Sequence, residues 1–103
     1  DYNYDQIFAR ELEGLANKND FLILISTSGK SKNIIEAAKT ANRIGMKSFA
    51  LLGKDGGEVS KLTSSNYIVP ENKTSIIQEV HIIIGHIICE FVEFFKTKNS
   101  LNI

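Results

Sequence analysis

The sequence contains a single cysteine, a single proline and no surplus of charge of either sign. The lone cysteine, Cys89, lies in an apolar run and cannot form an internal disulfide, which excludes a disulfide-stabilised secreted scaffold and fits a reducing compartment. The opening residues 1–5 lack both the basic start and the apolar stretch of a signal peptide. These absences predict a cytoplasmic protein.

Charge is balanced, with twelve basic and twelve acidic residues, and the basic residues are scattered along the chain. A protein without a net field or a basic patch attracts polyanions weakly, so nucleic acid is not an expected partner. Residues 76–95 are apolar enough to suggest a membrane span. They are interrupted by Gln78, Glu79, His81, His86, Glu90 and Glu93. Because such groups are costly in hydrocarbon, a membrane is not an expected partner either.

Apolar periodicity predicts alternating helices and strands in a chain whose 103 residues suit one domain. Residues 21–25, all apolar, are typical of a strand buried on both faces of a parallel sheet. We expect further strands at 47–52 and 66–69, helices at 4–15, 34–44, 59–62 and from 74 or 75 to about 98, and a frayed tail at 99–103. This order predicts an α/β fold with an open, doubly wound parallel sheet and flanking helices.

Two features predict that the chain belongs to something larger. Three strands form a small sheet with unprotected edges, and a chain that begins with a helix resembles the later part of a larger α/β unit. In the last predicted helix the polar side chains gather in about a third of the circumference, and Ile, Val and Phe fill most of the rest. So broad an apolar surface indicates burial between subunits.

The segment 26–31, between the first predicted strand and the next helix, is rich in hydroxyl groups. They belong to Ser26, Thr27, Ser28 and Ser31. In open α/β sheets ligands bind beyond the carboxyl ends of the strands, where the first amides of a helix attract anions, and Gly29 allows close approach. The segment is therefore predicted to hold the phosphate of a sugar phosphate. The alternative is that Ser31 caps the helix and the other hydroxyls stabilise a turn.

A nucleotide P-loop is a second alternative, because Gly29-Lys30-Ser31 matches the end of the Walker motif. That motif requires a glycine five residues before Gly29, where this chain has Leu24. The apolar strand occupies that place, so the loop is too short for the motif.

Several segments resemble the sugar isomerase (SIS) domain of bacterial phosphoheptose isomerases in order and spacing. They are Phe21–Asn33, Gly45-Met46-Lys47, Leu52–Gly57, Ile77–His81 and Gly85-His86. The Ser-Thr-Ser-Gly stretch marks the whole superfamily, whereas the Gly-Lys-Asp-Gly-Gly turn and the Gln-Glu-Val-His helix are more specific to the heptose branch. The resemblance implies one partial SIS-type sugar-phosphate-binding domain over residues 1–98, without the family's amino-terminal helices and first strand, followed by a tail at 99–103.

The resemblance also implies the conversion of sedoheptulose 7-phosphate to D-glycero-D-manno-heptose 7-phosphate, on the way to the heptose of lipopolysaccharide or capsule. By the family pattern, the phosphate is bound by Ser26, Thr27, Ser28 and Ser31. The same resemblance implies that Asp1 touches the sugar, that Gln78 contacts substrate and zinc, and that His86 is both a zinc ligand and a catalytic acid/base group. The family further implies a homo-oligomer of four subunits. A second histidine and a catalytic glutamate of the family have no counterpart here, so the chain alone is expected to be inactive.

Exchange between an aldose and a ketose moves a proton between neighbouring carbons through an enediol, which requires a proton-transferring group and a positive centre near the oxygens. His86 is the residue expected to transfer the proton, and zinc would supply the positive centre. His81, among apolar neighbours, is expected to be a hydrogen-bonded core residue that lies away from the polar stripe. The alternative function is a non-catalytic SIS module that senses sugar phosphates or mediates protein assembly.

Overall fold

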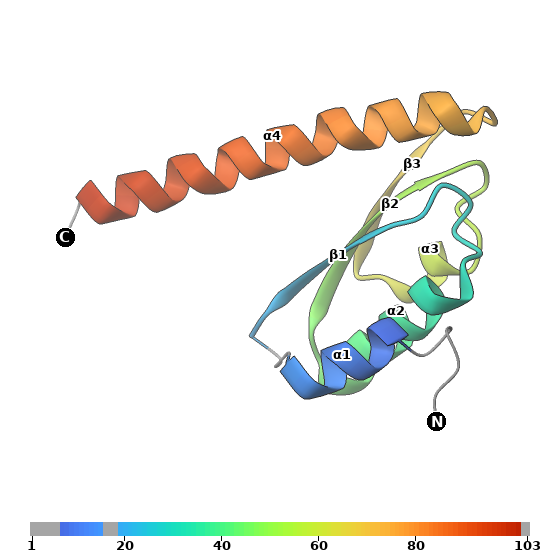
Figure 1. Cartoon of the computed structure of the whole chain (residues 1–103), viewed down its shortest axis with the longest axis horizontal. Coiled ribbons are helices and arrows are strands. Elements are labelled where there is room, and N and C mark those ends of the chain that lie inside the picture. The colour runs from blue at the N-terminus through green and yellow to red at the C-terminus, as the bar shows by residue number, and fades with distance from the viewer. Residues whose placement is uncertain (1–6, 16–18, 102–103) are drawn as a thin grey trace.

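The computed structural model describes residues 7–15 and 19–101, which alternate between helices and strands (Figure 1). In chain order they form α1 (Ile7–Leu15), β1 (Phe21–Ile25), α2 (Lys32–Ile44), β2 (Lys47–Gly53), α3 (Val59–Leu62), β3 (Ser65–Val69) and α4 (Thr74–Leu101). The three predicted strands and the short third helix are therefore confirmed. Residues 4–6, where the first helix was expected to begin, lie outside the described residues.

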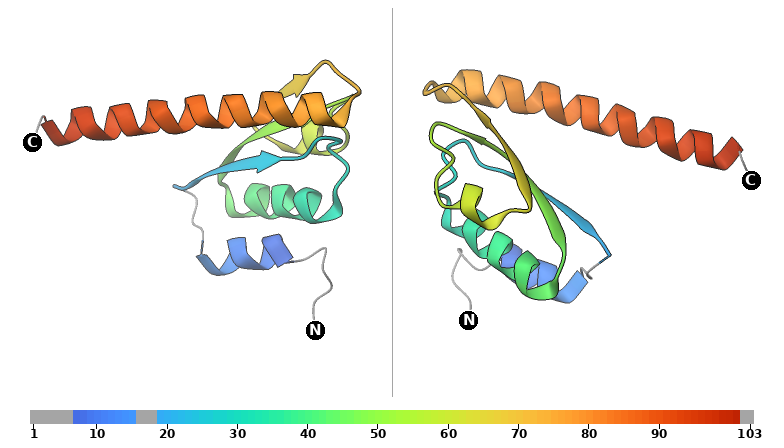
Figure 2. Two further views of the ribbon diagram at one scale, coloured as in Figure 1. Left: turned by 45° about the horizontal axis from the view of Figure 1, so that its top comes forward. Right: turned by 180° about the vertical axis from the view of Figure 1, so that it is seen from behind.

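The strands form one parallel sheet in the order β1-β2-β3. Helices α1, α2 and α3 lie on one side of this sheet and α4 lies on the other (Figure 1; Figure 2). The register places Ile25 beside Leu51 and Gly53 beside Val69, so the strands end close together at one edge of the sheet. The predicted open α/β arrangement is confirmed.

The core lies between the sheet and α2. It consists of Leu24, Ala50 and Leu52 from the strands, Ala37 and Ala38 from α2, and Val59 from α3. The alanines let α2 approach the sheet closely, which a larger side chain at either position would prevent. At its end α2 stops at Gly45, whose φ of 87° lies in the left-handed region and whose N–H donates to the carbonyl of Ala41.

Strand β1 is buried on one face only, which corrects the expectation that both faces are covered. Leu24 points into the core, whereas Phe21, Ile23 and Ile25 are 60%, 41% and 53% exposed. The reason is that side chains alternate across a strand and α4 packs against β2 rather than β1. The apolar character predicted for this segment is confirmed, but β1 is an edge strand of this sheet and its outer face is only partly covered by the described residues.

Helix α4 is longer than expected, since its 28 residues continue to Leu101. The expected tail at 99–103 is therefore helical as far as Leu101, and residues 102–103 lie outside the described residues. The sequence after residue 95 contains neither glycine nor proline, so no strong stop signal ends the helix. Only the first part of α4 lies over the sheet, and the rest extends beyond it (Figure 1).

Most of the apolar surface of α4 faces outward. Among the side chains described between 74 and 94, only Ile77 and His81 are buried. The exposed large apolar residues are Ile76, Ile82, Ile83, Ile87, Phe91, Val92 and Phe94. By length and composition alone, the stretch Thr74–Phe94 meets the criteria for crossing a membrane. The polar side chains along this stretch favour protein rather than lipid as the partner that covers its apolar surface.

Candidate functional site

The hydroxyl loop, residues 26–31, connects the end of β1 to the start of α2. Ser26 extends the sheet, because its N–H donates to the Leu51 carbonyl over 3.0 Å. Within the loop, the N–H of Gly29 donates to Ser26 Oγ over 3.0 Å and the N–H of Lys30 donates to Ser28 Oγ over 3.1 Å. The turn-stabilising alternative is thus correct for two of the hydroxyls, and each can still donate its own proton to a ligand.

Ser31 does not cap α2 with its side chain, contrary to the simpler alternative. It occupies the N-cap position with extended backbone, but its hydroxyl donates to Asn33 Oδ1 and makes no capping bond. The amides of the first turn of α2 are therefore left without a side-chain cap, and such amides attract anions.

The loop is supported from behind by the turn between β2 and α3. Gly29 has a φ of 68°, and a Cβ atom there would lie 1.9 Å from the Gly56 carbonyl oxygen. Gly57 has a φ of 55°, and its Cβ would lie 2.4 Å from the Gly29 carbonyl oxygen. The same carbonyl accepts from the N–H of Val59 over 3.1 Å. Two glycine segments thus touch backbone to backbone, a role for Gly56 and Gly57 that the sequence interpretation missed, although the paired glycines were visible.

One cavity of about 650 Å³ joins the hydroxyl loop to α4. From the loop side it is lined by Ile25, Ser26, Thr27, Ser31 and Ile34, and from α4 by Gln78, His81, Ile82, Gly85 and His86. The structure therefore brings five of the predicted site residues to one place. Ser28 is not among the lining residues, and Asp1 lies outside the described residues.

The cavity contains no charged carboxylate or ammonium group among its lining residues. Its polar groups are hydroxyls, one amide and two imidazoles. An anion that enters meets hydrogen-bond donors and no acidic side chain of the lining set, which suits a phosphate held by neutral groups. The arrangement can bind a phosphate at the loop and present Gln78 and His86 to the rest of the ligand.

His81 departs from its predicted position. The expected hydrogen bond is confirmed, because the ring is 3% exposed and Nε2 donates to the Leu52 carbonyl oxygen over 2.8 Å. It does not lie away from the polar residues, however, because it lines the same cavity as Gln78 and His86. Lining positions 78, 81, 82, 85 and 86 follow the three- and four-residue spacing of one helix face.

A zinc ion would find too few ligands in the described part of the chain. Gln78 and His86 line the cavity, but no group of three His, Cys, Asp or Glu residues among the described residues could hold a metal. Structural and catalytic zinc sites use three or four protein ligands. The residues present do not by themselves form a zinc centre.

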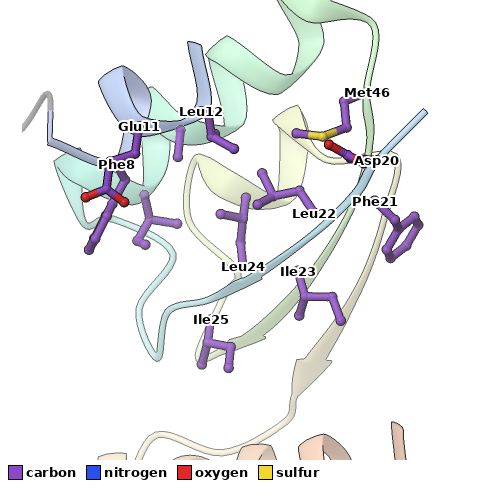
Figure 3. Close-up of a pocket in the computed structure, with 12 residues that line it drawn as sticks. Phe8, Glu11, Leu12, Asp20, Phe21, Leu22, Ile23, Leu24, Ile25 and Met46 are labelled. Carbon is purple, nitrogen blue, oxygen red and sulfur yellow. The ribbon is translucent and has the colours of Figure 1, made fainter. Parts of the chain in front are cut away.

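A second cavity, of about 620 Å³, lies between α1 and β1. Figure 3 shows its lining, which is apolar apart from Glu11 and Asp20. The exposed face of β1, with Ile23 and Ile25, forms part of the wall. Such a surface resembles an incompletely covered hydrophobic core rather than a catalytic site.

Comparison with known proteins places this geometry in context. A family model described as the SIS domain matches residues 1–53. The phosphoheptose isomerase of Sulfurimonas denitrificans is 50% identical over 93 residues, which is 90% of this chain and 48% of that protein. That of Helicobacter pylori strain P12 is 48% identical over 100 residues, which is 96% of this chain and 52% of that protein. The chain thus spans about half the length of the curated relatives it matches.

A solved structure has the same fold. The structure of a phosphoheptose isomerase from Neisseria gonorrhoeae superposes with a TM-score of 0.85 at 38% sequence identity. The match covers 89% of this chain and 52% of that one.

The backbone contact behind the loop generates a prediction about stability. Gly57→Ala should lower the free energy of unfolding by about 2–4 kcal/mol, because the new Cβ is strained at positive φ and meets the Gly29 carbonyl. Gly14→Ala is the matched control, since a Cβ at Gly14 meets nothing within 4 Å. It should leave stability unchanged or raise it by up to about 1 kcal/mol. Urea unfolding measures both, and equal values for the two variants would contradict the contact.

Proposed function

The chain belongs to the SIS domain family, and on that premise we propose that it forms part of an isomerase that interconverts an aldose phosphate and a ketose phosphate. The observation that carries the proposal is the single cavity in which the hydroxyl loop faces Gln78 and His86. A phosphate-binding group on one wall and an acid/base group on the other are what a phosphosugar isomerase requires.

The phosphate is proposed to bind at Ser26, Thr27, Ser28 and Ser31. The uncapped first turn of α2 adds main-chain donors to the hydroxyls. Ser26 and Ser28 also hold the loop through their bonds to the Gly29 and Lys30 amides. The loop therefore has its shape before the ligand arrives, which reduces the entropy lost on binding.

His86 is proposed to transfer the proton. In the ketose-to-aldose direction a proton leaves C1, the enediol forms, and a proton returns at C2, while the O2 carbonyl becomes a hydroxyl and the O1 hydroxyl becomes a carbonyl. His86 can serve one of these transfers, and Gln78 can orient an oxygen of the sugar. A second acid/base group is needed, and we propose that the remainder of a longer protein supplies it. Asp1 of this chain is proposed as a further contact to the sugar.

The substrate is proposed to be sedoheptulose 7-phosphate and the product D-glycero-D-manno-heptose 7-phosphate, a precursor of lipopolysaccharide or capsule heptose. Support comes from the relatives, which are named phosphoheptose isomerases. Zinc is proposed as cofactor by the same resemblance. Gln78 and His86 would be two of its ligands, the others would come from outside the described chain, and zinc would supply positive charge near the sugar oxygens.

A homo-oligomer, by resemblance a tetramer in the cytoplasm, is proposed to cover the apolar surface of α4. Ile83, Ile87 and Phe94 are 58%, 59% and 63% exposed, and their four- and seven-residue spacing places them on one face of α4. A monomer rarely leaves so many large apolar side chains exposed on one face. If protein covers the apolar surface of α4, the polar side chains of the helix stay hydrated. Lipid would remove that water, which is costly for polar groups.

The second candidate is a non-catalytic module that senses sugar phosphates or mediates assembly. The observation in its favour is that the hydroxyl loop lies wholly within the described residues, whereas the family resemblance places a second acid/base residue outside this chain. A module that only senses sugar phosphates needs the hydroxyl loop and no acid/base residue.

Turnover separates the two functions. The full-length protein, incubated with sedoheptulose 7-phosphate with and without a chelator, should form the aldose only when metal is present. The aldose is quantified by chromatography. Absence of turnover in both conditions, with the ketose still bound, would favour the sensor.

Phosphate binding predicts the effect of a single hydroxyl. Thr27→Val keeps the shape of the side chain but removes the donor from the cavity wall, and should weaken binding of a phosphosugar by about 1–3 kcal/mol, as for other buried hydrogen bonds. Ser75→Ala, an exposed hydroxyl outside the cavity lining, is the control and should leave the affinity unchanged. Isothermal titration calorimetry measures both, and equal affinities would count against the loop as the phosphate site.

Assembly is tested by a charge on the apolar face of α4. Ile83→Glu places a carboxylate where an oligomer would bury an isoleucine and should shift the protein to smaller species, because an unpaired buried charge is costly. Lys61→Gln, exposed on α3 on the opposite side of the sheet, is the control. Light scattering after size exclusion gives the masses, and an unchanged mass for Ile83→Glu would place the subunit contact elsewhere.

A further inference from the structure

Helix α4 carries one wall of the candidate site but has a narrow attachment to the sheet. Of its side chains described between 74 and 94, only Ile77 and His81 are buried. Both lie near the end of β2, one helical turn apart. These two buried contacts are therefore the main described attachments that place Gln78 and His86 relative to the hydroxyl loop.

The two contacts differ in kind. Ile77 packs over Gly53, where a Cβ would lie 2.6 Å from Ile77 Cδ1, and such packing resists approach without fixing rotation. His81 is directional, because Nε2 donates over 2.8 Å to one carbonyl oxygen, that of Leu52. A directional hydrogen bond from the helix to one strand atom constrains both the axial position of α4 and its rotation.

Packing alone does not account for an imidazole at this position. Nε2 donates its proton to the carbonyl, which leaves Nδ1 as the ring nitrogen not used in this bond. Nδ1 is buried and has no hydrogen-bond partner among the described residues. A leucine would fill the space without burying an unpaired ring nitrogen, so the histidine is accounted for by the bond that Nε2 makes.

We propose that His81 is a positioning residue that, through its bond to the Leu52 carbonyl, sets the distance between the hydroxyl loop and the residues Gln78 and His86. The proposal rests on the proposed isomerase function for its catalytic consequence. Its structural content, the placement of α4 on β2, does not depend on which sugar is bound. His81 itself transfers no proton in this scheme.

The test compares His81→Leu with His81→Gln in the full-length protein. His81→Leu removes the donor, and should lower kcat about 100-fold by displacing Gln78 and His86 on the scale of about 1 Å. Its dissociation constant for inorganic phosphate should stay within about twofold, because the loop is held by contacts that do not involve His81. His81→Gln retains an N–H donor and should recover most of kcat. Glu79→Gln, exposed on α4 and outside the cavity, is the control.

Crystal structures of these variants give a readout independent of activity. Relative to Glu79→Gln, α4 should be displaced from the loop in His81→Leu and restored in His81→Gln. An undisplaced α4, equal kcat for His81→Leu and His81→Gln, or a parallel loss of phosphate binding would overturn the proposal. If His81→Leu does not fold, His81→Met, with a flexible apolar side chain, repeats the comparison. If the unmodified protein turns over no phosphosugar, the isomerase function is wrong and the displacement of α4 alone decides the role of His81.

Discussion

The carboxyl end of β2 is the support on which the candidate site depends. Three consecutive residues act there. The Leu51 carbonyl receives the N–H of Ser26, the Leu52 carbonyl receives His81, and Gly53 is small enough for the Thr27 carbonyl and Ile77 to approach together. A Cβ at Gly53 would lie 2.8 Å from that carbonyl and 2.6 Å from Ile77 Cδ1. The loop and α4, distant in sequence, thus share one rigid attachment.

Most of the fold, and the hydroxyl-loop half of the candidate site, can be predicted from local sequence patterns. The apolar run 21–25, the Gly45 stop and the hydroxyl-rich segment 26–31 each contain their own signal, and the structure places them as predicted. The burial of β1 could not be predicted, because the number of neighbours a strand has is a property of the sheet and not of the strand. The end of α4 was misplaced because residues 96–101 contain neither glycine nor proline, the residues that most strongly end a helix.

The contacts that hold the site together are the part that sequence could not provide. The partner of His81 is the main-chain oxygen of a residue 29 positions earlier. Because every residue has a main-chain oxygen, no side-chain pattern in the sequence reveals this partner. The contact of Gly29 with Gly56 and Gly57 is likewise made by backbone atoms. The paired glycines indicated a turn, but only the tertiary structure shows that the turn touches the loop. Residue spacing identifies which face of α4 is polar, and the sheet determines where that face points.

The glycine contact behind the loop has a consequence for how specificity can change. Since the backbone contacts of Gly29 with Gly56 and Gly57 support residues 26–31 from behind, the proposed phosphate-binding loop is held by contacts that do not involve the opposite wall of the cavity. Substitutions along α4 can then change the part of the cavity proposed to surround the sugar carbons, while the proposed phosphate site keeps its shape. In this architecture, the proposed phosphate site and the residues that surround the sugar can change independently of each other.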